Sequence, residues 1–379
     1  MSRKDWELNV LFVLTARFPT TKAYGVTTYE TMKALSRLGH EAEIISLRNL
    51  HETQKSRRVG RELKAETNSV SSKKFTRLHF NMLRFKIFIL ATKLYRGRID
   101  LVWLREPQLA LLAWFLINSA IIVIEIHQRQ KYLNKTIIKI LIKQKRVVIC
   151  PIKLSLGRDF RSAKGNMVPA PMSVNSNFLF EGSKRTVSDK GSFNKVIYIG
   201  NISNHWQEEC FLYFLRNTRL LAAGPEVESI TILGVSKDWF KEKSLDYFLK
   251  NSKFRVLGHV SHSEITNLLE PGMIAVLSYY DNDYFRDTFP IKAVEYAALK
   301  VPIIASDTEA HRELFEPGCV KYFDMNVDNL DLSESVLEMI QNSAELEAQA
   351  QRAFNWARNF TYENRARAIL NEVKQRLAR

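Results

Sequence analysis

Two carboxylates stand eight positions apart around the predicted start of a short helix. Asp287 comes before Pro290, and Glu295 lies five positions after that proline. Proline is favoured in the first turn of a helix, where its missing N–H has no partner to lose. Free N–H groups at a helix N-terminus bind phosphate, and carboxylates accept hydrogen bonds from sugar hydroxyls. The stretch therefore fits a ligand that carries both groups, although acids in a first turn can also serve only to complement the helix dipole.

A histidine in the first half of the chain is the next candidate. His127 directly follows the apolar run 120–126, which we predict to be a strand. Open parallel sheets bind ligands at the carboxyl ends of their strands, so this position favours a contact with a ligand. The alternative is a hydrogen-bonded histidine with a structural role.

The elements around these residues alternate between strands and helices. In the first half, a strand at 9–14 precedes a loop at 15–25. Gly25 in this loop allows a close approach of backbone and ligand, or is simply a turn residue. A helix then ends at Gly39, a typical C-cap. The further elements of this half are strands at 43–46, 100–104, 120–126 and 146–149 and helices at 108–117 and 131–144.

The second half repeats the alternation. A strand at 195–199 ends at Gly200 and Asn201, and the helix that contains Glu295 leads to a strand at 302–305. Alternating strands and helices predict parallel sheets that are covered on both faces. We therefore expect an α/β chain with two Rossmann-like halves. The further elements here are a helix at 206–222 and strands at 230–234, 254–257 and 274–277.

The charge of the chain is unevenly distributed. Residues 1–190 carry 35 Lys and Arg against 14 Asp and Glu, whereas the rest of the chain carries 21 against 26. Such a basic half is typical of proteins that bind nucleic acid or anionic lipid. The segment 51–98 holds 13 of these basic residues, interleaved with phenylalanines. It fits either a membrane-surface helix or a helix packed on the core with a solvated basic face.

Composition also limits the compartment and the chemistry. The 379 residues suffice for two domains, and three scattered cysteines without CxxC spacing favour a reducing compartment over disulfides or structural zinc. We find no apolar signal core at the start, and the apolar run 109–124 is shorter than the ~20 residues that span a bilayer. Asp281 and Asp283 form a D-x-D pair that we interpret as a solvated turn rather than a metal site. We expect a cytoplasmic protein without metal.

Together these motifs resemble those of GT-B glycosyltransferases, in particular the retaining group 1 family (glycosyltransferase family 4). The family signature E-x7-E stands here as Asp287-x7-Glu295, followed by Pro302 and a strand, and Phe-Pro-Ile-Lys-x-x-Glu-Tyr at 289–296 is similar to a variant among bacterial polysaccharide enzymes. The resemblance covers nearly the whole chain. Weaker similarities are Phe18-Pro19 with Gly25, His127 after its strand, Gly258-His259-Val260, and the tail from Trp356 to Tyr362.

The resemblance implies a GT-B fold with two Rossmann-like domains and a C-terminal helix that crosses back to the first domain. The implied acceptor-side domain is 1–175, a linker follows at 176–192, and the nucleotide-sugar-binding domain is 193–358. Residues 359–379 form the returning helix.

The resemblance also implies roles for individual residues. Glu295 would hold the ribose hydroxyls of the nucleotide, and Asp287 would contact hydroxyls of the donor sugar. His127 would approach the same sugar across a cleft, so that Asp287 and His127 are the catalytic candidates. The donor is a substrate, so we expect no cofactor. The other implied donor-binding residues are Gly25, Gly200, Asn201, Gly258, Phe289, Pro290, Ile291 and Lys292.

The sequence departs from the family pattern near these residues. The first signature acid is aspartate, Asp287, and Pro290 replaces the usual glycine and so removes one N–H donor. The Arg and Lys that usually follow the first strand of the second domain are absent after Gly200. Such cations stabilise the charge of the departing diphosphate. The candidates to supply this charge are Arg105, Arg286 and Lys292.

We therefore predict a retaining, metal-independent glycosyltransferase of the hexosyltransferase type. It would move a sugar from a nucleotide-sugar to a hydroxyl of a glycan or lipid-linked acceptor in cell-surface polysaccharide or lipopolysaccharide biosynthesis. The basic first half predicts peripheral binding to the anionic inner face of the cytoplasmic membrane. One alternative is a GT-B-like assembly partner with impaired catalysis. Another is a basic nucleic-acid-binding protein, although no nucleic-acid-binding motif is present and we expect no such partner.

Overall fold

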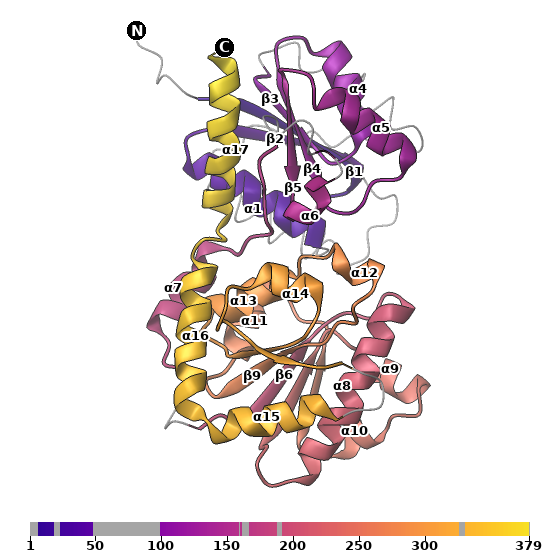
Figure 1. Ribbon diagram of the computed structural model, residues 1–379, viewed down its shortest axis with the longest axis vertical. Coiled ribbons are helices and arrows are strands. Elements are labelled where there is room, and N and C mark those ends of the chain that lie inside the picture. Colours follow the sequence, from indigo (N-terminus) through magenta and orange to yellow (C-terminus); the bar gives the residue numbers. More distant parts are fainter. Residues whose placement is uncertain are drawn as a thin grey trace. The chain divides into compact units, whose positions relative to one another are not determined.

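The computed structural model describes residues 7–18, 23–47, 99–158, 160, 167–187, 192–325 and 330–378. The chain divides into two compact units, which are shown in Figure 1. Unit 1 comprises Met1–Ser173 and Tyr362–Arg379, and unit 2 comprises Val174–Thr361. The basic segment 51–98, for which we predict a membrane-surface or core-packed helix, lies outside the described residues.

Unit 1 is built on a parallel sheet. Among its described residues, the sheet has five strands in the order β2-β1-β3-β4-β5. The central strands β3 and β4 are buried along their whole length, as expected where helices cover both faces. The strands are β1 (Asn9–Arg17), β2 (Glu41–Leu47), β3 (Leu101–Leu104), β4 (Ile121–Ile126) and β5 (Val147–Pro151).

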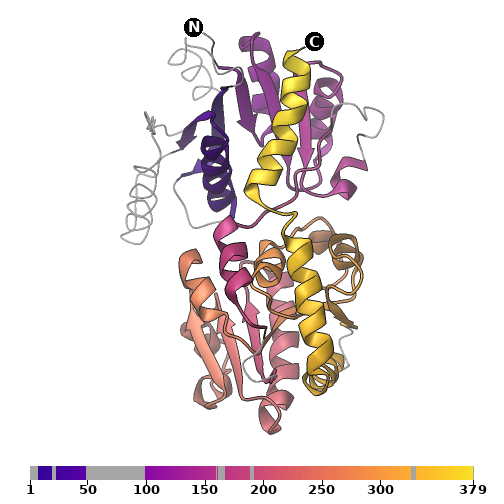
Figure 2. The same ribbon diagram turned by 90° about the vertical axis from the view of Figure 1, so that its left-hand side faces the viewer.

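The helices of unit 1 cover the two faces of this sheet. Helices α1 (Ala23–Arg37) and α17 (Tyr362–Leu377) contact each other and share one apolar core with the sheet (Figure 2). Helix α4 (Pro107–Leu116) packs on β3 and β4 and contacts α5 (Tyr132–Leu141). A short helix, α6 (Leu154–Gly157), follows β5. The prediction that the last helix crosses back to the first Rossmann-like half is confirmed.

Local signals place several helix ends in unit 1. Pro107 stands at the first position of α4, and Gly39 has a φ of +85° just after α1, where only glycine is unstrained. The loop predicted at 15–25 is too long, because β1 continues to Arg17 and α1 already begins at Ala23. Gly25 consequently lies buried in the first turn of a helix instead of in a loop.

Unit 2 has a second parallel sheet. In the part of the chain that is described, its six strands follow the order β11-β10-β9-β6-β7-β8. This order reverses between β6 and β9, which is the topological switch point where open α/β sheets bind ligands. The strands are β6 (Lys195–Ile199), β7 (Ser229–Leu233), β8 (Phe254–Gly258), β9 (Met273–Leu277), β10 (Ile303–Ser306) and β11 (Lys321–Phe323).

The helices of unit 2 form two cores, one on each face of this sheet. One core contains residues of α8 (His205–Ala223) and α15 (Asp331–Gln341). The other contains residues of α13 (Ile291–Ala298) and α16 (Ser343–Ala357). The shorter helices are α9 (Lys237–Glu242), α10 (Tyr247–Lys250), α11 (His262–Leu268), α12 (Asp283–Arg286) and α14 (Glu309–Leu314).

The linker predicted at 176–192 contains a helix, α7 (Ser176–Lys184). Asn175 caps its N-terminus by accepting a hydrogen bond from the N–H of Asn177, and Phe178 is buried in the core of unit 2. Gly182 faces α13 so closely that a Cβ there would lie 1.9 Å from the carbonyl oxygen of Ala298. The serine and glycine content of this stretch predicts a flexible connection. Packing on α13 stabilises a helix there instead.

Candidate functional site

The first turn of α13 is tied to the last residue of β6. Lys292 donates from Nζ to the carbonyl oxygen of Ile199 at 2.6 Å, and the N–H of Ile199 donates to the Tyr296 hydroxyl at 3.1 Å. β6 pairs with β9 only as far as Ile197, so these two side chains satisfy backbone groups that the neighbouring strand leaves open. The contacts hold the start of α13 beside Gly200, at the carboxyl end of the sheet.

Lys292 lies in an aromatic and half-buried setting. Its ammonium is 4.9 Å from the ring centre of Tyr198 and 5.2 Å from that of Tyr279. Burial lowers the pKa of Lys292 to about 8, against a smaller opposing effect of the Glu295 carboxylate. Among the described residues, no acid forms an ion pair with it. Lys292 is therefore a cation at the sheet edge that can pair with an incoming anion.

The other two predicted cations are engaged with acids. Arg286 lies 2.8 Å from Asp283, 3.7 Å from Asp281 and 3.5 Å from Glu309. The D-x-D pair is thus the ion-pair partner of an arginine within its own turn. In the described ranges, no group of three or more His, Cys, Asp or Glu is arranged to hold a metal ion.

Glu295 is buried and bound to a histidine from another helix. Its side chain is 6% exposed, and its Oε1 lies 2.5 Å from Nε2 of His262, the first residue of α11. The imidazole of His262 also packs against Phe178, with ring centres 5.2 Å apart. His262 was not among the predicted site residues. The capping box formed by Ser261 and Glu264, which fixes the start of α11, was the available signal.

Three neighbouring strands of unit 2 end in glycine. Gly200 follows β6, Gly234 follows β7, and Gly258 ends β8. The N–H of Gly234 donates to the carbonyl oxygen of Gly258 at 2.7 Å. Gly234 has a φ of +92°, and a Cβ there would lie 2.2 Å from the carbonyl oxygen of Gly200. Gly234 is therefore required by its positive φ and by the close Gly200 carbonyl, whereas a Cβ at Gly258 would meet nothing within 4 Å, so this edge has open space there.

The remaining predicted residues of unit 2 lie around the start of α13. Asp287 is the C-cap of α12 and is half-buried, and Pro290 is the N-cap of α13. Phe289 packs against Phe360 with ring centres 5.9 Å apart, so its side chain belongs to the core. Asn201 is exposed just beyond β6. The roles predicted for these residues toward a donor stay predictions.

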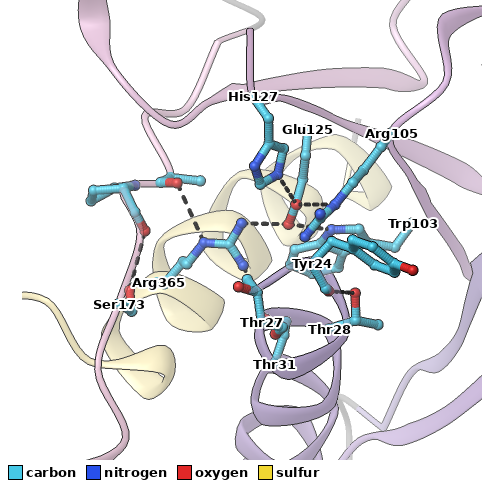
Figure 3. Close-up of polar contacts among 12 residues, drawn as sticks. Tyr24, Thr27, Thr28, Thr31, Trp103, Arg105, Glu125, His127, Ser173 and Arg365 are labelled. Atoms are coloured by element: carbon cyan, nitrogen blue, oxygen red, sulfur yellow. Dashed lines mark hydrogen bonds and ion pairs between the residues drawn. The ribbon is translucent and has the colours of Figure 1, made fainter. Parts of the chain in front are cut away.

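His127 of unit 1 belongs to a buried polar network centred on Glu125, the residue two positions before it (Figure 3). Nε2 of His127 lies 2.7 Å from Oε2 of Glu125, which also accepts from Nε of Arg105 at 3.1 Å. Oε1 of Glu125 accepts from Nε1 of Trp103 at 2.7 Å and from the guanidinium of Arg365 on α17. Arg105 therefore forms an ion pair with a carboxylate of its own unit.

The electrostatics of this network fix the charge of its members. Burial raises the pKa of Glu125, but Arg365, Arg105 and the contact with His127 outweigh it and hold the pKa well below the usual range. Burial and the charge of Arg105 lower the pKa of His127 to about 4. Glu125 is consequently an anion and His127 a neutral imidazole at neutral pH. Neither Glu125 nor Arg365 was among the predicted site residues, although an acid within the apolar run 120–126 was a signal for the former.

Comparisons with known proteins bear on the family and the fold. Residues 194–342 match the family model described as "Glycosyl transferases group 1". This match lies within unit 2 and covers 149 of the 379 residues, so it identifies a group 1 glycosyltransferase domain in this part of the chain. The predicted family is confirmed for that part. Comparison with curated protein sequences gives no match.

Several solved structures are similar to this chain over nearly its whole length. A glycosyltransferase from Rickettsia africae is 16% identical with a TM-score of 0.73, and the match covers 98% of this chain and 99% of that one. Anabaena Alr3699/HepE in complex with UDP is 12% identical with a TM-score of 0.67, over 97% and 100% of the two chains. Sucrose-phosphate synthase from Thermosynechococcus elongatus is 12% identical with a TM-score of 0.67, over 98% and 100%. At such identities these structures confirm the predicted GT-B fold and leave the substrates open.

Each helix in the described part of the chain is too short or too polar to span a lipid bilayer.

Proposed function

We propose that the enzyme transfers a sugar from a nucleotide-sugar to a hydroxyl of a glycan or lipid-linked acceptor, with retention and without metal. The observation that carries this proposal is the pairing of the buried Glu295 on α13 with the partly exposed His262 on α11, beside strands that end in glycine. HepE, a protein of the same fold, is known in complexes with UDP and with UDP-glucose. UDP is therefore the first nucleotide to test.

Glu295 has the properties of a ribose-binding carboxylate. It accepts through Oε1 from a proton on Nε2 of His262, which orients the carboxylate, and a carboxylate has further acceptor sites for two neighbouring hydroxyls. Its position on α13, one turn after the helix start, puts these acceptors near the free N–H groups of the first turn. Carboxylate and amides together fit a ligand with a diol and a phosphate.

Lys292 supplies the charge that the missing Arg and Lys would otherwise provide. Its ammonium is held at the carboxyl end of β6 by the Ile199 carbonyl, and no described acid neutralises it. A cation aimed at the departing diphosphate contributes on the order of 3 kcal/mol to transition-state stabilisation. Asp287 and His127 remain the predicted contacts of the donor sugar. Rate enhancement then comes from positioning and electrostatics.

The acceptor and the place of action follow from the charge of the first half. An excess of Lys and Arg in residues 1–190 supports peripheral association with the anionic inner face of the cytoplasmic membrane, where lipid-linked and lipopolysaccharide-type acceptors are assembled. Co-sedimentation with phosphatidylglycerol vesicles that weakens at high salt would support this proposal. Equal binding to neutral vesicles would contradict it.

The test of the proposed function is calorimetric titration with UDP and GDP and their sugars, paired with a turnover assay. Glu295→Ala should abolish the binding of the nucleotide, because its diol loses the acceptor. Glu338→Ala, which removes an exposed carboxylate paired with Lys321 in the same unit, is the matched control and should bind normally. Absence of binding for every donor would refute the proposal.

The absence of Arg and Lys after Gly200 favours a second candidate, an assembly partner with impaired catalysis. If the protein binds a donor but neither transfers its sugar nor hydrolyses it, the role of assembly partner is favoured over glycosyl transfer.

A further inference from the structure

The carboxylate of Glu125 is fully occupied by donors. Oε1 accepts from Trp103 at 2.7 Å and from Arg365, and Oε2 accepts from Arg105 at 3.1 Å and lies 2.7 Å from Nε2 of His127. An ionised carboxylate has about four lone-pair positions and no proton to give. With all four in use, the ring nitrogen of His127 that faces Glu125 must be a donor (Figure 3).

The negative charge of Glu125 is stabilised by Arg365, a buried residue with several hydrogen-bond partners of its own. Arg365 is 1% exposed and donates to Oγ1 of Thr31 at 3.0 Å and to the carbonyl oxygen of Ala170 at 3.3 Å, in addition to Glu125. Thr31 lies on α1, Ala170 follows β5, and Glu125 lies on β4. Through Arg365, α17 therefore forms hydrogen bonds with three separate parts of unit 1. A buried carboxylate with two guanidinium partners keeps its charge over the whole physiological pH range.

The opposite ring nitrogen of His127 is turned away from this network. The side chain of His127 is 24% exposed, and no described residue forms a hydrogen bond with Nδ1. In a neutral imidazole whose Nε2 carries the proton, Nδ1 holds the lone pair and can only accept. The charged groups that face the ring are Glu125 on β4, Arg105 after β3 and Arg365 on α17. The two guanidinium charges disfavour a second proton on the ring.

We propose that Glu125 is a positioning residue that locks His127 in the Nε2–H tautomer, so that Nδ1 is a permanent hydrogen-bond acceptor toward the substrate. The group that His127 contacts is then a hydrogen-bond donor. This favours a donor sugar that presents a hydroxyl to Nδ1 and disfavours one that presents an acceptor without a proton there. The specificity part of this inference rests on the proposed function, whereas the tautomer does not.

The tautomer is tested on the free protein by ¹⁵N NMR of the imidazoles. The His127 signals, assigned by their absence in His127→Asn, should show protonated Nε2 and bare Nδ1 from pH 8 down to about pH 5. In Glu125→Gln the lock is lost, and we expect a mixture of both tautomers. A wild-type ring protonated on Nδ1, or a folded Glu125→Gln protein with an unchanged single tautomer, would overturn the inference.

Loss of Glu125 leaves Arg365 buried without its counter-ion, so the single variant can fail to fold. Glu125→Gln combined with Arg365→Met removes both charges and keeps the volumes. Mixed tautomers in this folded double variant would support the lock, and a single Nε2–H tautomer would refute it. Glu372→Gln, a carboxylate on α17 that pairs with Arg376, is the matched control and should leave the His127 signals unchanged.

Donor selection is tested by comparing UDP-glucose with analogues in which one sugar hydroxyl at a time is replaced by fluorine, an acceptor without a proton. We expect the analogue changed at the hydroxyl that faces Nδ1 to lose at least about tenfold in kcat/KM in the wild type, and this loss to shrink in the Glu125→Gln/Arg365→Met variant, where a flipped ring can donate to the fluorine. The same losses in both proteins for every analogue would overturn the specificity. If none of these donors reacts, the proposed function fails while the NMR result still decides the tautomer.

Discussion

Replacing Lys292 by methionine should stabilise the protein and impair its catalysis at the same time. Burial shifts the pKa of Lys292 from 10.5 to about 8. At 1.36 kcal/mol per pKa unit, the charged lysine costs about 3 kcal/mol of folding free energy at neutral pH. Methionine leaves the Ile199 carbonyl without its Lys292 donor, which offsets about 2 kcal/mol of the gain from removing this charge. We therefore expect Lys292→Met to raise the free energy of unfolding by about 1 kcal/mol at pH 7.

The pH dependence of this gain has a definite sign. Below pH 8 both folded and unfolded wild-type chains carry the proton on Lys292, and the full cost is present. Between about pH 8 and 10.5 the folded state has released the proton and the unfolded state has not. The wild type then gains up to about 1.4 kcal/mol per pH unit relative to the variant. The advantage of Lys292→Met should therefore vanish and reverse as the pH rises through this window.

The assay is urea unfolding of both proteins at pH 7 and at pH 9.5, together with transfer kinetics. Activity of Lys292→Met should fall by about 10² to 10³, and wild-type kcat/KM should fall above about pH 8 as the free enzyme loses this charge. Lys321→Met, which removes an exposed lysine of the same unit, should change neither property much. A variant that is equally destabilised at both pH values and still active would refute the reasoning.

Three further substitutions test packing, capping and the site in unit 2. Gly182→Ala should destabilise unit 2 by about 3 kcal/mol in urea unfolding, because its Cβ would lie 1.9 Å from the Ala298 carbonyl oxygen, and a loss below 1 kcal/mol would contradict this packing. Asn204→Ala removes the N-cap of α8 and should cost about 1 kcal/mol by the same assay, whereas Asn204→Asp should restore it. His262→Phe keeps a ring but removes the partner of Glu295, and should weaken UDP binding about tenfold by calorimetry; unchanged affinity would show that the pair does not orient the carboxylate.

The elements of this fold could be predicted where the signal is local. The alternation of strands and helices along the chain predicted both parallel sheets, and Gly39 marked the end of a helix correctly. The stretch 176–184 was misread, because its capping residue Asn175 is a weak signal and its helix depends on packing against α13. Tertiary packing there overrides a composition that is typical of linkers.

The sequence motif of the candidate site could be predicted, but the side chains that pair with its residues could not. Glu295 was identified from spacing, but His262 stands 33 positions earlier and its pairing depends on how two helices meet. Glu125 and Arg365 are 240 positions apart, and a single sequence carries no pattern that joins them. Local spacing thus identified α13 as the candidate binding helix, whereas the side chains that orient and charge the site are brought together only by the fold.

The distance along the chain between Glu125 and Arg365 has a consequence for how the protein is made. Translation proceeds from the N-terminus, so β4 and then all of unit 2 are synthesised before α17. At about 5 to 20 residues per second, these 240 positions take on the order of tens of seconds. During that time Glu125 lacks Arg365, and the apolar face that α17 covers has no partner. Unit 1 is therefore the last part to reach its final state, although it is the first to leave the ribosome.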